Sequence, residues 1–162
     1  MMRILGIDYG EKRIGLAITD MQNSIAMPFG MIENNDSINE NILKLIKEND
    51  IGRIVIGRPV NLKGQPGYQA GVVDSFVSGV LKIYELPIST IDERFTSKIS
   101  SGLISGSPNM HREERNKNQN KKIPKKKINQ ARKSGAVDTI SATLILGDYL
   151  NLLKIQESKN EP

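Results

Sequence analysis

The sequence contains no cysteine and no tryptophan, and it has a single histidine. The absence of cysteine excludes disulfide bonds and thiolate zinc sites, and it makes a reducing compartment the simpler expectation. The lone His111 stands in a polar stretch, where a solvated imidazole is far more common than a metal ligand or a member of a Ser-His-Asp triad. Chemistry based on soft metal ligands or on a histidine base is therefore not supported.

The sequence also lacks a long apolar run and a signal-peptide pattern at its amino terminus. A membrane helix needs roughly 20 predominantly apolar residues in a row, and no stretch approaches that length. The 162 residues, 38% of them hydrophobic, fit one domain with a substantial core. We therefore expect a single cytoplasmic domain over residues 1–155 with no membrane partner, followed by a flexible tail at 156–162.

Basic side chains are concentrated in one segment. Residues 112–133 hold ten of the 23 lysines and arginines but only two of the 18 acids, which leaves 13 basic and 16 acidic side chains elsewhere. Residues 107–132 have no sustained apolar period, so we interpret them as a mobile basic loop. The loop contains five clustered lysines, which are Lys121, Lys122, Lys125, Lys126 and Lys127. Such a run binds phosphate backbones without reading sequence, although a merely solubilising loop has the same composition.

The apolar patterns outside that segment predict an α/β domain. A continuous apolar strand over residues 3–8 is followed, after a short polar turn, by a second at 14–19, which indicates an antiparallel hairpin. A weaker strand at 25–32 contains Pro28 and Gly30, which favour the edge of a sheet. Helices and strands then alternate, which indicates parallel strands joined by right-handed crossovers. The later elements are expected at about 37–49, 51–56, 67–84, 87–91, 96–106 and 136–153. Together they give a mixed five-stranded sheet with helices on both faces.

Two local features of the expected helices can be specified further. Asp36 or Ser37 is placed to cap the first helix. In the last helix, the apolar residues expected to form one buried stripe are Val137, Ile140, Leu144 and Leu152.

Acidic residues stand at three element boundaries. Asp8 ends the first strand, Asp92 and Glu93 end the last strand, and Asp138 lies in the first turn of the final helix. Neighbouring strand residues point to opposite faces, so at most one of Asp92 and Glu93 should face a shared site. Carboxylates without His or Cys partners suit Mg²⁺ or Mn²⁺, which support phosphodiester hydrolysis. Each acid alone also has a structural explanation, because Asp before Gly is common in turns and an acid favours a helix amino terminus.

The glycine-containing loop at 57–67 is a second candidate contact with phosphate. It follows a strand and precedes a helix, so its backbone amides could approach an anion. It matches neither the Walker nor the dinucleotide fingerprint, and a purely structural loop is an equal alternative.

Three motifs in order resemble the signature of the YqgF family, also called RuvX. They are Ile4-Leu5-Gly6-Ile7-Asp8-Tyr9-Gly10, Ile54-Val55-Ile56-Gly57-Arg58-Pro59 and Asp92-Glu93-Arg94-Phe95-Thr96-Ser97. The last helix, with Val137-Asp138 and Tyr149-Leu150, is similar to that of the family as well. The sequence departs from the family pattern at Arg58, at 95–97 and in its longer basic segment.

The resemblance implies an RNase H-like fold and a cytoplasmic bacterial nuclease that processes the 5′ end of pre-16S rRNA. Carried over residue by residue, it assigns Asp8, Glu93 and Asp138 as catalytic residues and as ligands of Mg²⁺ or Mn²⁺. The alternatives are a resolvase acting on DNA four-way junctions and a non-catalytic assembly factor that binds rRNA. We expect a monomer or weak homodimer. The candidate nucleic-acid contacts, besides the five clustered lysines, are Lys12, Arg13, Arg58, Arg94 and Lys133.

Overall fold

The computed structural model describes residues 2–60, 67–92 and 136–160. The predictions for the helix at 96–106 and for the loop at 107–132 fall outside these residues. Within them, the chain forms one sheet with the strand order β3-β2-β1-β4-β5. The strands are β1 (Arg3–Asp8), β2 (Arg13–Thr19), β3 (Ala26–Glu33), β4 (Ile51–Arg58) and β5 (Ile88–Asp92). The prediction of a mixed five-stranded sheet is confirmed.

The first three strands are antiparallel, and the last two run parallel to β1. Leu5 pairs with Ile18 and Asp8 with Gly15 across the β1–β2 hairpin, while β4 pairs in parallel with β1 and β5 with β4. β3 lies at the edge, as Pro28 and Gly30 suggested, and its pairing with β2 shifts register between Leu16 and Ala17. The carboxyl ends of β1, β4 and β5 therefore lie at the same end of the sheet.

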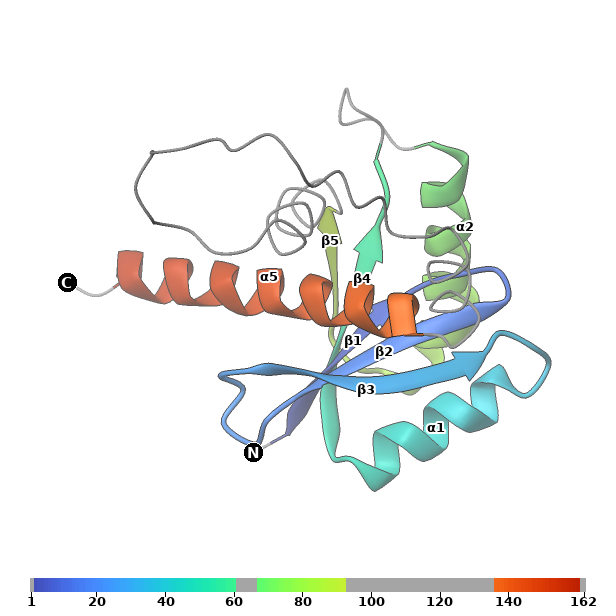
Figure 1. Ribbon diagram of the computed structural model, residues 1–162, viewed down its shortest axis with the longest axis horizontal. Helices are drawn as coiled ribbons and strands as arrows, with labels where there is room; N and C mark the ends of the chain where they lie inside the picture. Colours follow the sequence, from blue (N-terminus) through green and yellow to red (C-terminus); the bar gives the residue numbers. More distant parts are fainter. Residues whose placement is uncertain (1, 61–66, 93–135, 161–162) are drawn as a thin grey trace, which may run out of the picture.

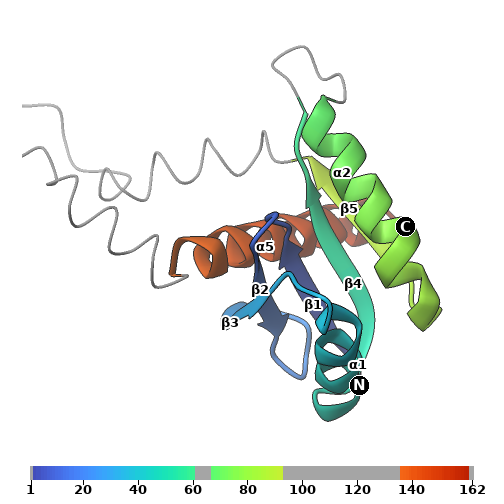
Figure 2. The same cartoon turned by 90° about the vertical axis from the view of Figure 1, so that its right-hand side faces the viewer.

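Helices cover both faces of this sheet (Figures 1 and 2). On one face lie α1 (Ile38–Glu48) and α2 (Tyr68–Phe76), the latter continued by a π-helical turn (Val77–Leu81) and a 3-10 turn (Lys82–Tyr84). On the other face lies α5 (Ala136–Asn160). The helical segment that was expected to end near Tyr84 does so, and Glu85 in the left-handed conformation follows it.

The cap of α1 differs in detail from the prediction. Ser37 stands at the N-cap position but its side chain makes no capping hydrogen bond. Instead, the side-chain oxygen of Asn35 accepts a hydrogen bond from the backbone N–H of Ser37 at 3.0 Å. An asparagine that bonds the backbone two residues ahead forms an Asx turn, so the chain enters the helix through that turn.

Two corrections apply to α5. The helix continues to Asn160 rather than ending near Leu153. The predicted stripe is also wrong, because Val137, Ile140 and Leu152 are exposed. The residues that α5 buries are Ala142, Ile145, Leu146, Tyr149 and Leu150. Apolar residues surround most of this helix, so spacing alone offered two stripes, and packing against the sheet selected the one with the full i, i+3, i+4, i+7 pattern.

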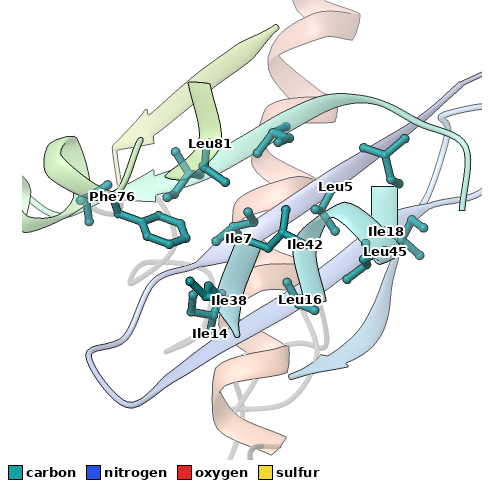
Figure 3. Packing of buried hydrophobic residues seen from close by; sticks show 14 residues of the cluster. Leu5, Ile7, Ile14, Leu16, Ile18, Ile38, Ile42, Leu45, Phe76 and Leu81 are labelled. Atoms are coloured by element: carbon teal, nitrogen blue, oxygen red, sulfur yellow. The ribbon is translucent and has the colours of Figure 1, made fainter. Parts of the chain in front are cut away.

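The core consists of two layers separated by the sheet. One layer, between the sheet and the helices α1 and α2, is built mainly from large aliphatic residues such as Leu5, Ile7 and Ile42 (Figure 3). The other, under α5, includes Ile4, Val55 and Ile91 from the strands. In the part of the chain that the structure describes, no helix has the length and apolar character needed to cross a membrane.

Candidate active site

Asp8 lies at the carboxyl end of the central strand, on the face that α5 covers. Side chains alternate along β1, with Leu5 and Ile7 in the layer under α1 and α2, and Ile4 in the layer under α5. A Cβ atom added to Gly6 would come within 2.8 Å of the Cβ of Leu146 in α5, which confirms the orientation of the even-numbered positions. Asp8 shares this orientation and is half-buried. Its carboxylate is therefore directed toward the side of the sheet where α5 begins.

Gly15 allows the first turn of α5, which contains Asp138, to lie near the carboxyl end of β1. A Cβ atom on Gly15 would overlap the backbone carbonyl of Asp138, so only glycine at this position allows the first turn of α5 to lie directly on β2. Gly15 is also the register partner of Asp8, and paired Cα atoms of antiparallel strands are roughly 4.5–5.5 Å apart. The backbone of Asp138 thus lies beside the strand position next to Asp8. The fold thus brings the backbone of Asp138 to the strand position next to Asp8, although 130 positions separate the two residues in the sequence.

The first turn of α5 is also fixed to the edge strand. The hydroxyl of Thr139 donates a hydrogen bond to the carbonyl of Gly30 in β3 at 2.9 Å. Together with the contact at Gly15, this bond fixes the start of α5 relative to β2 and β3. Asp138 itself lies in this first turn, as predicted, and is half-buried.

Asp92 occupies the opposite face of the sheet. Ile91 packs in the layer under α5, so the next residue along β5 alternates to the other side. Its register partner is Arg58 of β4, whose side chain reaches α2. Asp92 is thus not on the same face as Asp8. Glu93 lies outside the described residues, and its place in the site stays a prediction.

Arg58 binds a carboxylate of the protein itself. Its guanidinium donates from Nε and Nη2 to the two oxygens of Asp74 in α2, at 2.9 Å and 2.7 Å. This bidentate pairing lowers the pKa of the Asp74 carboxyl. The sequence motif indicated Arg58 as a nucleic-acid contact, but the pairing with Asp74 could not be anticipated because nothing in α2 marks it. The role of Arg58 toward nucleic acid stays a prediction.

The remaining predicted contacts divide into two groups. Lys12 is exposed in the β1–β2 turn, and Arg13 is half-buried at the start of β2. The side-chain amide of Asn34 braces this turn by donating to the carbonyl of Gly10 at 3.0 Å. The others, which are Arg94, Lys121, Lys122, Lys125, Lys126, Lys127 and Lys133, lie outside the described residues.

A small cavity of about 60 Å³ adjoins the end of β1 on the side of α2. Its walls include Tyr9, Gly10, Pro59, Gln69 and Val73. The ring of Tyr9 packs against Phe76 of α2 with a centroid separation of 4.8 Å. The described part of the loop at 57–67 thus contributes Pro59 to this cavity on the α2 side of the sheet. Sequence reasoning did not identify this cavity, because it depends on how α2 is set against β1.

The chemical type of the donor atoms near the start of α5 suits a hard divalent cation. Asp8 and Asp138 supply carboxylate oxygens, which are the ligands that Mg²⁺ and Mn²⁺ prefer. Residues 2–60, 67–92 and 136–160 contain no group of three or more His, Cys, Asp or Glu side chains placed to hold a metal ion. Asp8 and Asp138 are the two predicted ligands that lie among the described residues, and their role as ligands stays a prediction.

Comparison with known proteins agrees with the motifs. A curated relative from Endomicrobium trichonymphae is 34% identical over 94% of this chain and 97% of its own length, and one from Sulfurihydrogenibium is 37% identical over 94% and 92%. Both are named "Putative pre-16S rRNA nuclease". Among solved structures, that of Thermus thermophilus RuvC aligns with a TM-score of 0.49 and 10% identity, covering 93% of this chain and 96% of that one. The family described as "RuvX: Holliday junction resolvase" matches residues 2–122. The motifs, the family match and the two curated relatives together show that the chain belongs to the RuvX family.

Proposed function

We propose that this protein is a cytoplasmic, divalent-metal-dependent nuclease that trims the 5′ end of pre-16S rRNA. The observation that supports the proposal is the close approach of the Asp138 backbone to Gly15, which is the register partner of Asp8 at the carboxyl end of β1. Ligands of open α/β sheets bind outside the carboxyl ends of their strands, so the two acids lie where a substrate would be expected. The names of the relatives support RNA as the substrate.

In this proposal Asp8, Asp138 and Glu93 hold the cation, and the rest of the site positions the RNA. When bound, Mg²⁺ or Mn²⁺ would supply Lewis-acid stabilisation of the phosphodiester and a nucleophilic water at neutral pH. Lys12, which is exposed in the turn between β1 and β2, would pair with a substrate phosphate. Thr139 holds the first turn of α5 on β3 and so keeps Asp138 in place.

A DNA junction resolvase is the second candidate, because the matching family carries that description. The two are separated by incubating the purified protein with Mg²⁺ and either an RNA bearing the 5′ extension of 16S rRNA or a four-way DNA junction. We expect cleavage of the RNA, loss of cleavage in EDTA, and recovery on adding Mg²⁺. Cleavage of the junction alone would replace the RNA proposal, and no cleavage of either by a pure, folded protein would favour a binding factor.

The clustered lysines supply a separate test of RNA binding. Neutralising Lys121, Lys122, Lys125, Lys126 and Lys127 should weaken RNA binding and make the slope of log affinity against log salt shallower. The expected change is roughly 0.7 for each lost phosphate contact on a single strand. The measurement is a salt titration of wild type and variant on one RNA, and equal slopes would mean that these lysines do not touch the backbone.

A further inference from the structure

The cavity at the carboxyl end of β1 has the size of a site for one small ring. It encloses about 60 Å³ between the β1–β2 turn, the end of β4 and the first turns of α2. One water needs roughly 10–15 Å³ of cavity, so there is room for about four or five. Their share of liquid volume, roughly 30 Å³ each, is comparable to that of a six-membered ring with its substituents. The cavity therefore fits a single planar ring better than a folded segment of another protein.

Two contacts hold the walls of this cavity in place. The ring of Tyr9 packs on Phe76 of α2 at a centroid separation of 4.8 Å. Arg58, which precedes the wall residue Pro59, donates to both oxygens of Asp74 at 2.9 Å and 2.7 Å and so joins the end of β4 to α2. These walls are therefore already formed before a ligand binds, which lowers the ordering cost of binding.

The lining combines apolar faces with two polar side chains. Val72 and Val73 of α2 and the ring of Tyr9 supply the apolar part. Gln69 and Glu11 also line the cavity, and both are exposed, so an amide and a carboxylate stand at its mouth. A mostly apolar pocket with a few polar groups is typical of sites for small ligands. A flat ring with a hydrogen-bonding edge matches this lining, because its faces need apolar contact and its edge needs a donor and an acceptor.

The position of the cavity favours a nucleobase as that ring. Tyr9 follows Asp8 directly, and consecutive Cα atoms are about 3.8 Å apart. Asp8 faces α5 while Tyr9 packs in the layer under α2, so a strand of RNA that crosses the end of β1 would place a phosphate near Asp8 and a base at Tyr9. Tyr68, next to Gln69 at the start of α2, is 82% exposed, and its ring is open to stacking with a neighbouring base.

We propose that this cavity binds one pyrimidine base of the RNA substrate and prefers cytosine. This assignment rests on the proposed nuclease function, which makes RNA the ligand. The side-chain amide of Gln69 would donate to N3 or O2 of the ring, and the carboxylate of Glu11 would accept from the exocyclic amino group of cytosine. Uracil carries a carbonyl oxygen in place of that amino group, which would set two acceptors against each other. The second ring of a purine exceeds the space.

The test measures the binding of nucleosides to the full chain. Nucleosides carry no phosphate, so basic side chains do not contribute and cleavage cannot occur. Cytidine, uridine and adenosine are titrated, and the NMR shifts of the backbone amides of Gly10, Gln69 and Val72 report the contact. We expect saturable shifts at these amides, with cytidine bound at least about fivefold more tightly than uridine, as for one hydrogen bond to a charged group at an exposed mouth. Adenosine should bind more weakly than either.

Three variants assign the preference to side chains. Glu11→Gln should remove the preference for cytidine over uridine, because an amide both donates and accepts. Gln69→Leu keeps the size but removes the amide, and it should weaken binding of both pyrimidines about tenfold. Gln22→Leu is the matched control, since it makes the same change in the β2–β3 connection at the other end of the sheet and should bind as wild type does. All three replaced side chains are exposed, so thermal unfolding should be unchanged.

Four results would overturn the base pocket. They are the absence of saturable shifts at Gly10 and Gln69, equal binding of cytidine and uridine to wild type, tighter binding of adenosine, and binding to Gln69→Leu that equals wild type. Failure of the base pocket and failure of the nuclease proposal are distinguishable. Cleavage of RNA without nucleoside binding would leave the nuclease and remove the pocket, whereas nucleoside binding without cleavage of any RNA would leave the pocket and remove the nuclease.

Discussion

The two faces of the sheet are built on different principles. The face under α1 and α2 is filled with large aliphatic side chains, including Leu5, Ile7 and Ile54, all fully buried. The face under α5 has glycine at two strand positions, Gly6 and Gly15, where the helix lies so close that even a Cβ would collide. Large buried side chains supply most of the hydrophobic stabilisation, whereas close approach of backbones fixes position. We infer that one face mainly holds the domain together, and that the other mainly sets the first turn of α5 against the strand position next to Asp8.

The largest expected effect comes from removing charge at the α5 face. Asp8→Asn or Asp138→Asn should reduce RNA cleavage to background while largely preserving the fold, because an amide keeps the shape but not the charge that holds the cation. The measurement is single-turnover cleavage with Mg²⁺, alongside thermal unfolding. Asp148→Asn is the matched control, since it makes the same change on the same helix outside the site and should leave cleavage intact. Retained activity in Asp8→Asn, in protein free of host nucleases, would remove Asp8 from the mechanism.

The opposite face should respond in stability rather than in chemistry. Ile42 of α1 is fully buried and lies over the strands in Figure 3. Ile42→Ala should lower the free energy of unfolding by about 2–5 kcal/mol, because it leaves a cavity in the aliphatic layer. Leu43→Ala, at the neighbouring exposed position, should cost far less. Cleavage per folded molecule should be unchanged in both variants, and a loss confined to Ile42→Ala in fully folded protein would show that the two faces are not independent.

Gly15→Ala tests the positional role of the α5 face directly. The added Cβ would displace the first turn of α5, with a cost to stability of about 1–3 kcal/mol, as for overpacking. A displacement near 1 Å lowers catalytic rates by about 10²-fold, so cleavage should fall further than stability predicts. Gly71→Ala in α2 is the control, because open space surrounds that position. If cleavage by Gly15→Ala equals that of wild type, the close approach has no catalytic role.

The sequence predicted the strands and the sheet class well, because their apolar runs are local and unambiguous. The positions of Asp8 at the end of a strand and of Asp138 at the start of a helix were also predictable. The contact between Gly15 and the carbonyl of Asp138 was not predictable, since it depends on where α5 lies across the sheet. The same dependence explains the wrong stripe on α5, where Ile140 was expected inside and Ile145 is buried instead.

Long-range polar partners were equally out of reach of sequence patterns. Arg58 was interpreted as a nucleic-acid contact from its motif, and only the packing of α2 on β4 brings Asp74 to its guanidinium. The Oδ2 atom of Asp148 is buried and has no hydrogen-bond partner among the described residues, and it has no sequence signal either, because an aspartate in a long helix is expected to face solvent. Both features arise from tertiary packing. Local patterns of residues along the chain do not predict such contacts.

The smallest expected effect concerns Asp148 of α5, because its partly buried carboxyl lowers the free energy of unfolding at neutral pH. Burial raises its pKa in the folded protein, so the folded state holds its proton more tightly than the unfolded state does. Its carboxyl therefore favours folding below the unfolded-state pKa, and this contribution is lost as pH rises through the folded-state pKa.

Asp148→Asn removes the ionisation, so at pH 7 it should raise the free energy of unfolding by up to about 1 kcal/mol, the low end for an unpaired buried group. At a pH below the unfolded-state value, near 3, the gain should vanish. Urea unfolding of wild type and variant at both pH values measures the difference, and a gain that is the same at pH 3 and pH 7 would mean that the buried charge of Asp148 carries no cost.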